Sequence, residues 1–178
     1  MSRPRSDTRE RIQEVARELF LARGVQRTSL QDIADKLGIT KPALYYHFSS
    51  REELVRSILV PLIDEGERFV AGHENSGGTG ARELLEGYFD FFYRHREDLA
   101  LVLAEWTMLT DFGLIDKVLA WHGRLGKLVF GSKPTLAQAT RAVVAFGGLQ
   151  DCCLQFPDTP HKQLRAKSVD AALAALGV

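Results

Sequence analysis

Apolar positions recur along most of the chain with the three- and four-residue spacing of amphipathic helices. The first stripe consists of Ile12, Val15, Ala16, Leu19 and Phe20. Asp7 stands where a helix cap is expected, and Gly24 stands where a left-handed stop is expected. The pattern predicts a first helix from residue 7 to residue 23.

A second, short helix is predicted after the connector 25–27. Thr28 and Gln31 have the spacing of a capping box at its start. Its apolar stripe consists of Leu30, Ile33, Ala34 and Leu37, and we assign Ile33 and Leu37 to the core. Gly38 is expected to end this helix after little more than two turns.

A third helix is predicted from Thr40 to Phe48. Pro42 falls in its first turn, where a missing N–H is tolerated. Leu44 and Phe48 lie one turn apart, so both are expected to face the core. The remaining side chains of this helix then point outward, and two of them are tyrosines.

A fourth helix is predicted from Arg51 to about residue 71, with apolar positions throughout. Pro61 lies inside this pattern and removes one backbone donor, which predicts a kink or a local break. The segment 72–80, GHENSGGTG, has the composition of a flexible linker. Further helices are expected near 81–95, 97–109, 112–130, 135–155 and 162–176. Sustained strand alternation is missing from the sequence, so the predicted class is all-α.

Composition narrows the class of protein. Of 178 residues, 45% are hydrophobic and 26% are charged, which excludes a disordered or collagen-like chain. The start MSRPRSDTRERI is charged, and no apolar run is long enough for a membrane span, so we expect a soluble cytoplasmic protein. The cysteines, Cys152 and Cys153, are adjacent and too few for a secreted disulfide framework.

The net charge of zero hides a difference between the two ends of the chain. Residues 1–60 carry 11 Lys and Arg against 8 Asp and Glu, whereas residues 61–178 carry 12 against 15. The first part is therefore positive by three charges, which favours a polyanionic partner for that part alone.

Two short helices joined by a tight turn at residues 38–40 form a predicted helix-turn-helix. The major groove of DNA accepts one α-helix, whose first turns reach the base edges. Thr40, Lys41, Pro42 and Ala43 stand at that end of the third helix, where the helix dipole also favours phosphate.

Three sequence motifs around this predicted turn are more specific than a generic helix-turn-helix. Residues 9–56 join ARELFLARG, TSLQDIADKLGITK and ALYYHFSSREEL, and this composite resembles the DNA-binding domain of the tetracycline-repressor (TetR) family. The resemblance implies a three-helix DNA-binding domain at 1–50 and an all-helical ligand-binding and dimerisation domain at 51–178. It also implies a homodimer that binds double-stranded DNA at a palindromic operator and leaves it when a small-molecule effector binds.

The resemblance assigns roles to ten residues. Lys41, Pro42, Ala43, Tyr45 and Tyr46, with Thr40 at the helix start, would face bases or backbone in the major groove. Gln31 would reach a base, and Thr28, His47 and Arg51 would mainly contact phosphates. Arg51 replaces the commoner Lys at its position and keeps the charge. Structural roles stay open for several of these residues: half-buried tyrosines at 45 and 46, packing for His47, an N-cap for Thr28 and a solvated charge for Lys41.

Aromatic residues are concentrated after the linker and are candidates for an apolar ligand pocket. The candidate ligand residues are Phe89, Phe92, Tyr93, Trp106, Trp121 and His122, with Glu105 as a polar neighbour. The alternative is an ordinary packed core. The segments 142–154 and 169–176 combine small and apolar residues and are expected to build a four-helix dimer interface, or else to pack within one subunit.

Catalysis finds no support in the sequence. The segment SGGTG lacks the strand and the Lys-Ser/Thr of a phosphate-binding loop, and the five His residues lack metal-binding spacing. We expect no enzyme and no cofactor. Two alternatives to a ligand-released repressor remain: a ligand-sequestering protein with weakened DNA recognition, and a regulator switched by oxidation of Cys152 or Cys153.

Overall fold

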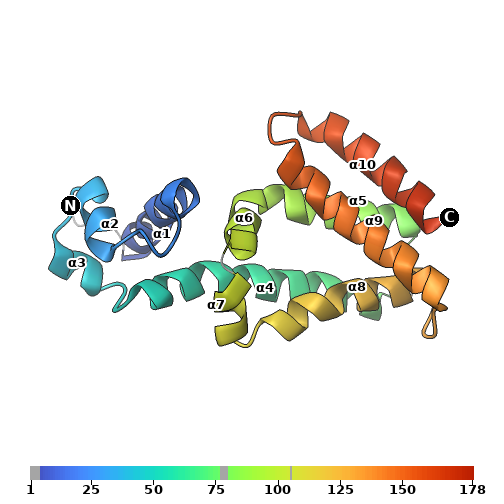
Figure 1. Ribbon diagram of the computed structural model, residues 1–178, viewed down its shortest axis with the longest axis horizontal. Helices are drawn as coiled ribbons and strands as arrows, with labels where there is room; N and C mark the ends of the chain where they lie inside the picture. Colours follow the sequence, from blue (N-terminus) through green and yellow to red (C-terminus); the bar gives the residue numbers. More distant parts are fainter. Residues whose placement is uncertain (1–4, 77–79, 105) are drawn as a thin grey trace. The chain divides into compact units, whose positions relative to one another are not determined.

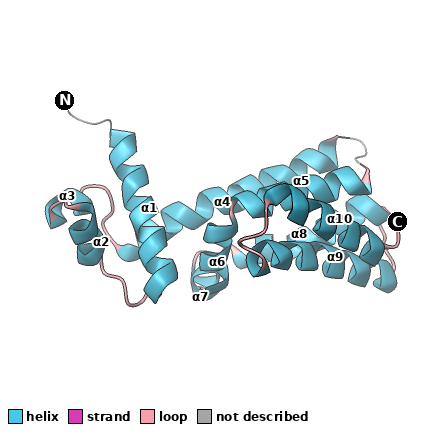
Figure 2. Cartoon of the chain, turned by 90° about the horizontal axis from the view of Figure 1, so that it is seen from above, coloured by secondary structure: helices cyan, strands magenta, loops and turns pink. Residues whose placement is uncertain are grey.

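The computed structural model describes residues 5–76, 80–104 and 106–178, and within these ranges every regular element is a helix (Figures 1 and 2). The helices are α1 (Arg5–Arg23), α2 (Leu30–Leu37), α3 (Lys41–Tyr45), α4 (Arg51–Asn75), α5 (Ala81–Arg94), α6 (Arg96–Ala104), α7 (Trp106–Asp111), α8 (Ile115–Phe130), α9 (Leu136–Gln155) and α10 (His161–Leu176). The predicted all-α class is therefore confirmed.

The chain divides into two compact units. The first comprises residues 1–62 and 97–112, and the second comprises residues 63–96 and 113–178. Helix α4 contributes its first half to one unit and its second half to the other. The functional division at residue 50 stays a prediction.

In the first unit, α1 packs on α2 and α2 packs on α3. Their shared core consists of the fully buried side chains of Ile12, Ala16, Phe20, Ile33, Leu44 and Phe48. Helix α1 ends as predicted before Gly24, whose φ of +87° is the left-handed conformation. The predicted cap Asp7 is wrong, because Asp7 lies inside the first turn of α1, where its charge favours the helix dipole.

The capping box of α2 is shifted by one residue from the prediction. Ser29, not Thr28, is the N-cap: its hydroxyl accepts from the Asp32 N–H, and Asp32 accepts from the Ser29 N–H at 2.8 Å. Thr28 is fully buried instead, and its hydroxyl donates to the Gly24 carbonyl at 2.9 Å. Because Thr28 is buried, the neighbouring Ser29 caps α2 in its place.

Helix α4 continues through Pro61 to Asn75, so the predicted local break does not occur. The first part of the predicted linker is also wrong, because residues 72–75 are helical. Residues 77–79 of that linker lie outside the described residues.

The second unit is a helical bundle in which α9 packs on α10, α8 and α5, and α10 packs on α5 (Figure 1). Its core contains the buried rings of Tyr88, Phe89, Phe91, Phe92, Trp121 and Phe146. Thr135 and Gln138 form a complete capping box at the start of α9. Helix α8 begins at Ile115 rather than at 112, because Gly113 takes a φ of +67° and interrupts the helical backbone.

Candidate nucleic-acid interface

Backbone hydrogen bonds stabilise the turn between α2 and α3. Gly38 adopts the left-handed conformation with a φ of +67°, and its N–H donates to the Asp35 carbonyl at 3.1 Å. The N–H of Ile39 donates to the Ala34 carbonyl at 3.0 Å. Thr40 then caps α3 as predicted, accepting from the Ala43 N–H at 3.3 Å.

Helix α3 ends at Tyr45, earlier than the predicted end at Phe48, and residues 46–47 form a turn before Phe48. The helix and this turn together have one buried and one exposed face. Leu44 and Phe48 are fully buried, as predicted, whereas Tyr45 is 45% exposed and Tyr46 is 65% exposed. Thr40, Lys41, Pro42 and Ala43 are also exposed. Most of the outward side chains at the start of this helix are therefore open to a partner, and two large aromatic rings lie among them.

Some side chains on the exposed face of α3 contact one another. The Lys41 ammonium lies 5.6 Å from the centre of the Tyr45 ring, and the Tyr46 ring meets the His47 ring edge-on at 5.4 Å between centres. His47 is half-buried, and its carbonyl accepts from Arg9 Nη1 at 2.9 Å. These contacts restrict the rotamers of the face before any partner binds.

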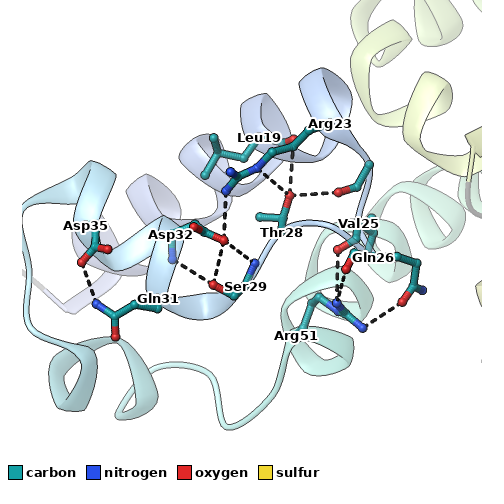
Figure 3. A network of polar contacts seen from close by, with 11 residues as sticks. Leu19, Arg23, Val25, Gln26, Thr28, Ser29, Gln31, Asp32, Asp35 and Arg51 are labelled. Carbon is teal, nitrogen blue, oxygen red and sulfur yellow. Dashed lines mark hydrogen bonds and ion pairs between the residues drawn. The ribbon is translucent and has the colours of Figure 1, made fainter.

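Other predicted DNA-contacting residues have partners inside this domain (Figure 3). The Thr28 hydroxyl reaches the Gly24 carbonyl, and Gln31 donates from Nε2 to Asp35 Oδ1 at 2.6 Å. Arg51 donates to the Val25 and Gln26 carbonyls at 3.3 and 3.1 Å and to Gln26 Oε1 at 3.0 Å. The structure thus brings Thr28 and Arg51 to the α1–α2 connector, and Gln31 to the outer face of α2.

Two charged residues that the sequence reasoning missed complete this network. Arg23 pairs with Asp32 at 3.0 Å, and Asp32 accepts from both the hydroxyl and the N–H of Ser29 (Figure 3). These hydrogen bonds, with the nearby Arg23 charge, hold the pKa of Asp32 below its usual value. The Ser29-x-x-Asp32 spacing is a cap signal in the sequence, but Thr28-x-x-Gln31 has the same spacing beside it.

Five of the six predicted ligand residues belong to the second unit, where they are buried or half-buried. Phe89, Phe92 and Trp121 are buried, and Tyr93 and His122 are half-buried. The Trp121 indole donates to Glu67 Oε2 at 3.2 Å, and His122 Nε2 lies 3.3 Å from the Tyr88 hydroxyl. Trp106 belongs to α7, but its side chain lies outside the described residues, as does Glu105.

Burial also shifts the pKa values of His122 and Tyr88, the hydrogen-bonded pair in this core. It lowers the pKa of His122, while the Asp151 carboxylate opposes the shift, so His122 is neutral over most of the physiological range. Burial is likewise the main reason that the pKa of Tyr88 is raised. The pair is thus a neutral hydrogen bond inside an aromatic core.

Each unit carries a groove on its described surface. The first, of about 540 Å³, is lined by Arg9, Gln13, Glu53, Arg56, Ser57, Val60 and Pro61. The second, of about 270 Å³, lies between the end of α9 and α10 and is lined by Cys152, Phe156, Thr159, Gln163, Leu164, Lys167, Ser168 and Ala171. Neither groove contains a predicted ligand residue.

Comparison with known proteins supports the DNA-binding interpretation of the N-terminal helices. Residues 12–58 match the family model described as "Bacterial regulatory proteins, tetR family". The transcriptional activator FasR of Mycolicibacterium smegmatis is 31% identical over 102 residues, which are 56% of this chain and 47% of FasR. The regulator TtgR of Pseudomonas putida is 39% identical over 69 residues, which are 39% of this chain and 33% of TtgR. The aligned part thus spans less than half the length of these relatives.

Solved structures are similar over nearly the whole chain. AmtR of Mycobacterium smegmatis has a TM-score of 0.78 at 23% identity, covering 99% of this chain and 89% of its own. The ketosteroid regulator KstR2 of Mycobacterium tuberculosis has a TM-score of 0.74 at 20% identity, covering 94% and 93%. At these identities the likeness shows the fold.

The first unit contains a helix-turn-helix with an exposed face on α3, and the relatives that match this part of the chain are named as transcriptional regulators. Residues 12–58 match the tetR family of bacterial regulatory proteins, and the resemblance seen in the sequence is confirmed over these residues. Among the described helices, none combines the length and the apolar character that a membrane crossing requires.

Proposed function

We propose that this protein is a homodimeric regulator that binds a palindromic operator through α3 and leaves it when a small-molecule effector binds. The observation that carries this proposal is the two-sided character of α3. Leu44 and Phe48 fix the helix in the core, while Tyr45 and Tyr46 stand exposed beside Lys41. The exposed rings and the Lys41 charge are the kinds of groups that contact bases and phosphates in a major groove.

In this proposal α3 lies in the major groove with its N-terminus toward the bases. Lys41 supplies a charge for guanine or phosphate, and the Tyr45 and Tyr46 rings contact bases and sugar through their edges. Pro42 and Ala43 are small enough to allow a close approach of the helix to the groove. Thr40 stands at the positive end of the helix, where a phosphate oxygen is favoured.

Dimerisation is proposed through α9 and α10. Leu136, Val143 and Val144 expose 81%, 51% and 63% of their surface on α9, which is costly for a monomer in water. Gly147 and Gly148 follow on the same helix and allow two helices to approach closely. A two-fold axis through this face gives two copies of α3, and such symmetry requires a palindromic operator.

Release by an effector is proposed as coupling between two sites. A small molecule that enters the aromatic core of the second unit, among the predicted residues Phe89, Phe92, Tyr93 and Trp121, favours one conformation of α4, the helix shared by both units. By linkage, that molecule must weaken operator binding by the same factor by which operator DNA weakens the molecule's own binding. The described relatives include both an activator, FasR, and a repressor, KstR2, and we propose repression for this chain.

Selection of the purified protein against a randomised DNA pool at near-physiological salt tests the proposal. The expected result is a palindromic consensus bound by a dimer with a Kd of roughly nanomolar strength. Binding that is only micromolar, salt-sensitive and without a consensus would instead support the ligand-sequestering alternative. The selected sequence then serves as the probe in a screen for the effector. We expect the operator itself to lie in DNA of the cytoplasm.

The redox-switched alternative is less well supported. Cys153 is fully buried, and burial raises the pKa of its thiol to about 12, so its reactive thiolate is scarce at neutral pH. Cys152 is half-buried on the same helix turn. A ligand-released regulator is therefore the function that we propose.

A further inference from the structure

Arg51, the first residue of α4, reaches back to the α1–α2 connector (Figure 3). Its Nη1 donates to the carbonyl oxygens of Val25 and Gln26, and its Nη2 donates to the Gln26 side chain. Its Nε is buried, and only 27% of its side chain is exposed. The guanidinium thus has three oxygen acceptors on one connector, 25 and 26 residues away in the sequence.

The connector that Arg51 holds leads directly into the DNA-facing part of the domain. Val25 is fully buried, and its carbonyl also accepts from the Thr28 N–H at 3.1 Å, which closes a tight turn. Ser29, the cap of α2, follows immediately. A shift of the Val25 and Gln26 carbonyls therefore moves the start of α2, on which α3 packs.

The planar guanidinium suits this task better than an ammonium group. Its N–H groups form a rigid fork that reaches several acceptors at once, whereas a lysine at position 51 is a single flexible point charge. A residue that served only to attract a phosphate would need the charge but not the fork. The observed acceptors are neutral oxygens, apart from Glu52 at 3.5 Å.

We propose that Arg51 is a positioning residue that fastens the α1–α2 connector to the first turn of α4, so that the placement of α2 and α3 on DNA follows α4. This inference rests on the proposed function of operator binding. It assigns Arg51 a role through the connector in place of the direct phosphate contact that the resemblance implies.

The two roles give opposite results for a substitution that keeps the charge. If Arg51 contacts a phosphate, Arg51→Lys preserves most of the affinity, and Arg51→Ala lowers the slope of log Kd against log salt by about one. If Arg51 fastens the connector, Arg51→Lys weakens operator binding nearly as much as Arg51→Ala, by about tenfold, with an unchanged salt slope. Gln26→Ala removes one acceptor and is expected to give a smaller loss.

Arg27→Lys provides the matched control, because it makes the same replacement in the same connector at an exposed side chain. We expect wild-type affinity for this variant. Thermal melting of every variant shows whether the domain stays folded, and Gln26→Ala keeps the proposal testable if the Arg51 variants unfold.

Hydrogen exchange on the DNA-free protein tests the fastening without reference to DNA. The amides of residues 25–32 are expected to exchange about tenfold faster in Arg51→Lys than in the wild type, because the connector opens more often. Unchanged exchange together with wild-type affinity in Arg51→Lys would overturn the proposal. A wild-type protein that binds no selected DNA would instead refute the proposed function, while the exchange result still decides whether Arg51 fastens the connector.

Discussion

Gln13 of α1 donates its side-chain amide to the carbonyl oxygen of Ser57 in α4 at 3.2 Å, and to the Ser57 hydroxyl at 2.9 Å. Pro61 lies four residues after Ser57 and has no N–H, so the Ser57 carbonyl lacks its helical donor. The side chain of a neighbouring helix replaces that donor. This replacement explains how α4 continues past a proline at which the sequence predicts a kink or a local break.

Gln13→Ala is expected to lower the free energy of unfolding by about 1–2 kcal/mol, because it leaves the Ser57 carbonyl without a donor. In a Pro61→Ala background the same substitution should cost less, since the alanine N–H can donate to that carbonyl. Urea denaturation of the four proteins gives the coupling between the two positions. Equal costs in both backgrounds would show that Gln13 does not compensate for the proline.

Gly66 in α4 lies directly against the indole of Trp121 in α8. A β-carbon built at position 66 would stand 2.3 Å from Trp121 Cη2 and 2.7 Å from Cζ2. The ring cannot move away freely, because it is buried and its Nε1 donates to Glu67. Gly66→Ala is therefore expected to destabilise the protein by about 1–3 kcal/mol through overpacking.

Gly72→Ala is the control for this prediction. A β-carbon at position 72, in the same helix, would meet nothing within 4 Å. Alanine is a better helix former than glycine, so this change should raise the stability by up to about 1 kcal/mol. Thermal unfolding of both variants measures the contrast, and a loss of similar size at both positions would mean that the contact with Trp121 is not its cause.

The capping residues show where sequence patterns succeed and where they fail. The stops at Gly24 and Gly38, the cap at Thr40 and the inward Leu44 and Phe48 all follow from local patterns, because each depends on backbone conformation or helical spacing. The start of α2 does not follow from a local pattern, because Thr28 and Ser29 both precede a polar residue by three positions. Only packing against α1 decides which of them is buried.

The aromatic residues of the second unit show a different limit. The ring centre of Tyr88 lies 4.5 Å from that of Phe92 and 5.1 Å from that of Phe146, so the Tyr88 ring contacts both. Helical spacing identifies such residues as inward-facing, but it does not distinguish a filled core from a lined pocket. The three acceptors of Arg51 were likewise beyond the sequence, because they depend on how the α1–α2 connector meets the first turn of α4.

Arg124 in α8 holds two carboxylates of α4, and this arrangement predicts a pH dependence of stability. Its Nη1 lies 2.6 and 2.8 Å from the Glu67 oxygens, and its Nη2 lies 2.6 Å from Glu74. Hydrogen bonds from Arg124 are the main cause that lowers the pKa of both carboxyls from their ordinary value of 4.5. Both groups therefore bind protons more weakly in the folded state than in the unfolded state.

A lowered carboxyl pKa stabilises the folded protein above the unfolded value and stops doing so as the pH falls through the folded value. Arg124→Gln should therefore be less stable than the wild type near neutral pH, and the difference should shrink below pH 4.5. Urea denaturation across this range measures it. Lys117→Gln is the control, because its partner Asp64 is exposed and 4.0 Å away. A loss of stability in Arg124→Gln that does not change with pH would contradict the linkage.

The adjacent cysteines are expected to differ in reactivity. Burial raises the pKa of the Cys153 thiol to about 12, whereas Cys152 is half-buried and lines the groove between α9 and α10. Alkylation of the folded protein near neutral pH should therefore label Cys152 first and leave Cys153 unlabelled until denaturant is added. Peptide mass spectrometry reads the two sites, and Cys152→Ser provides the control. Rapid labelling of Cys153 in the folded protein would reopen the redox-switched alternative.

Tyr45 and Leu44 are neighbours on α3, yet their substitution should affect different properties. Tyr45 is 45% exposed, so Tyr45→Ala should leave the melting temperature nearly unchanged while weakening operator binding by about 1–3 kcal/mol and altering the selected sequence. Leu44 is fully buried, so Leu44→Ala should cost about 2–5 kcal/mol of stability, and its binding loss should follow from unfolding. Calorimetric melting and titration with the selected operator separate the two effects. If Tyr45→Ala left both affinity and sequence preference intact, α3 would not present this face to the groove.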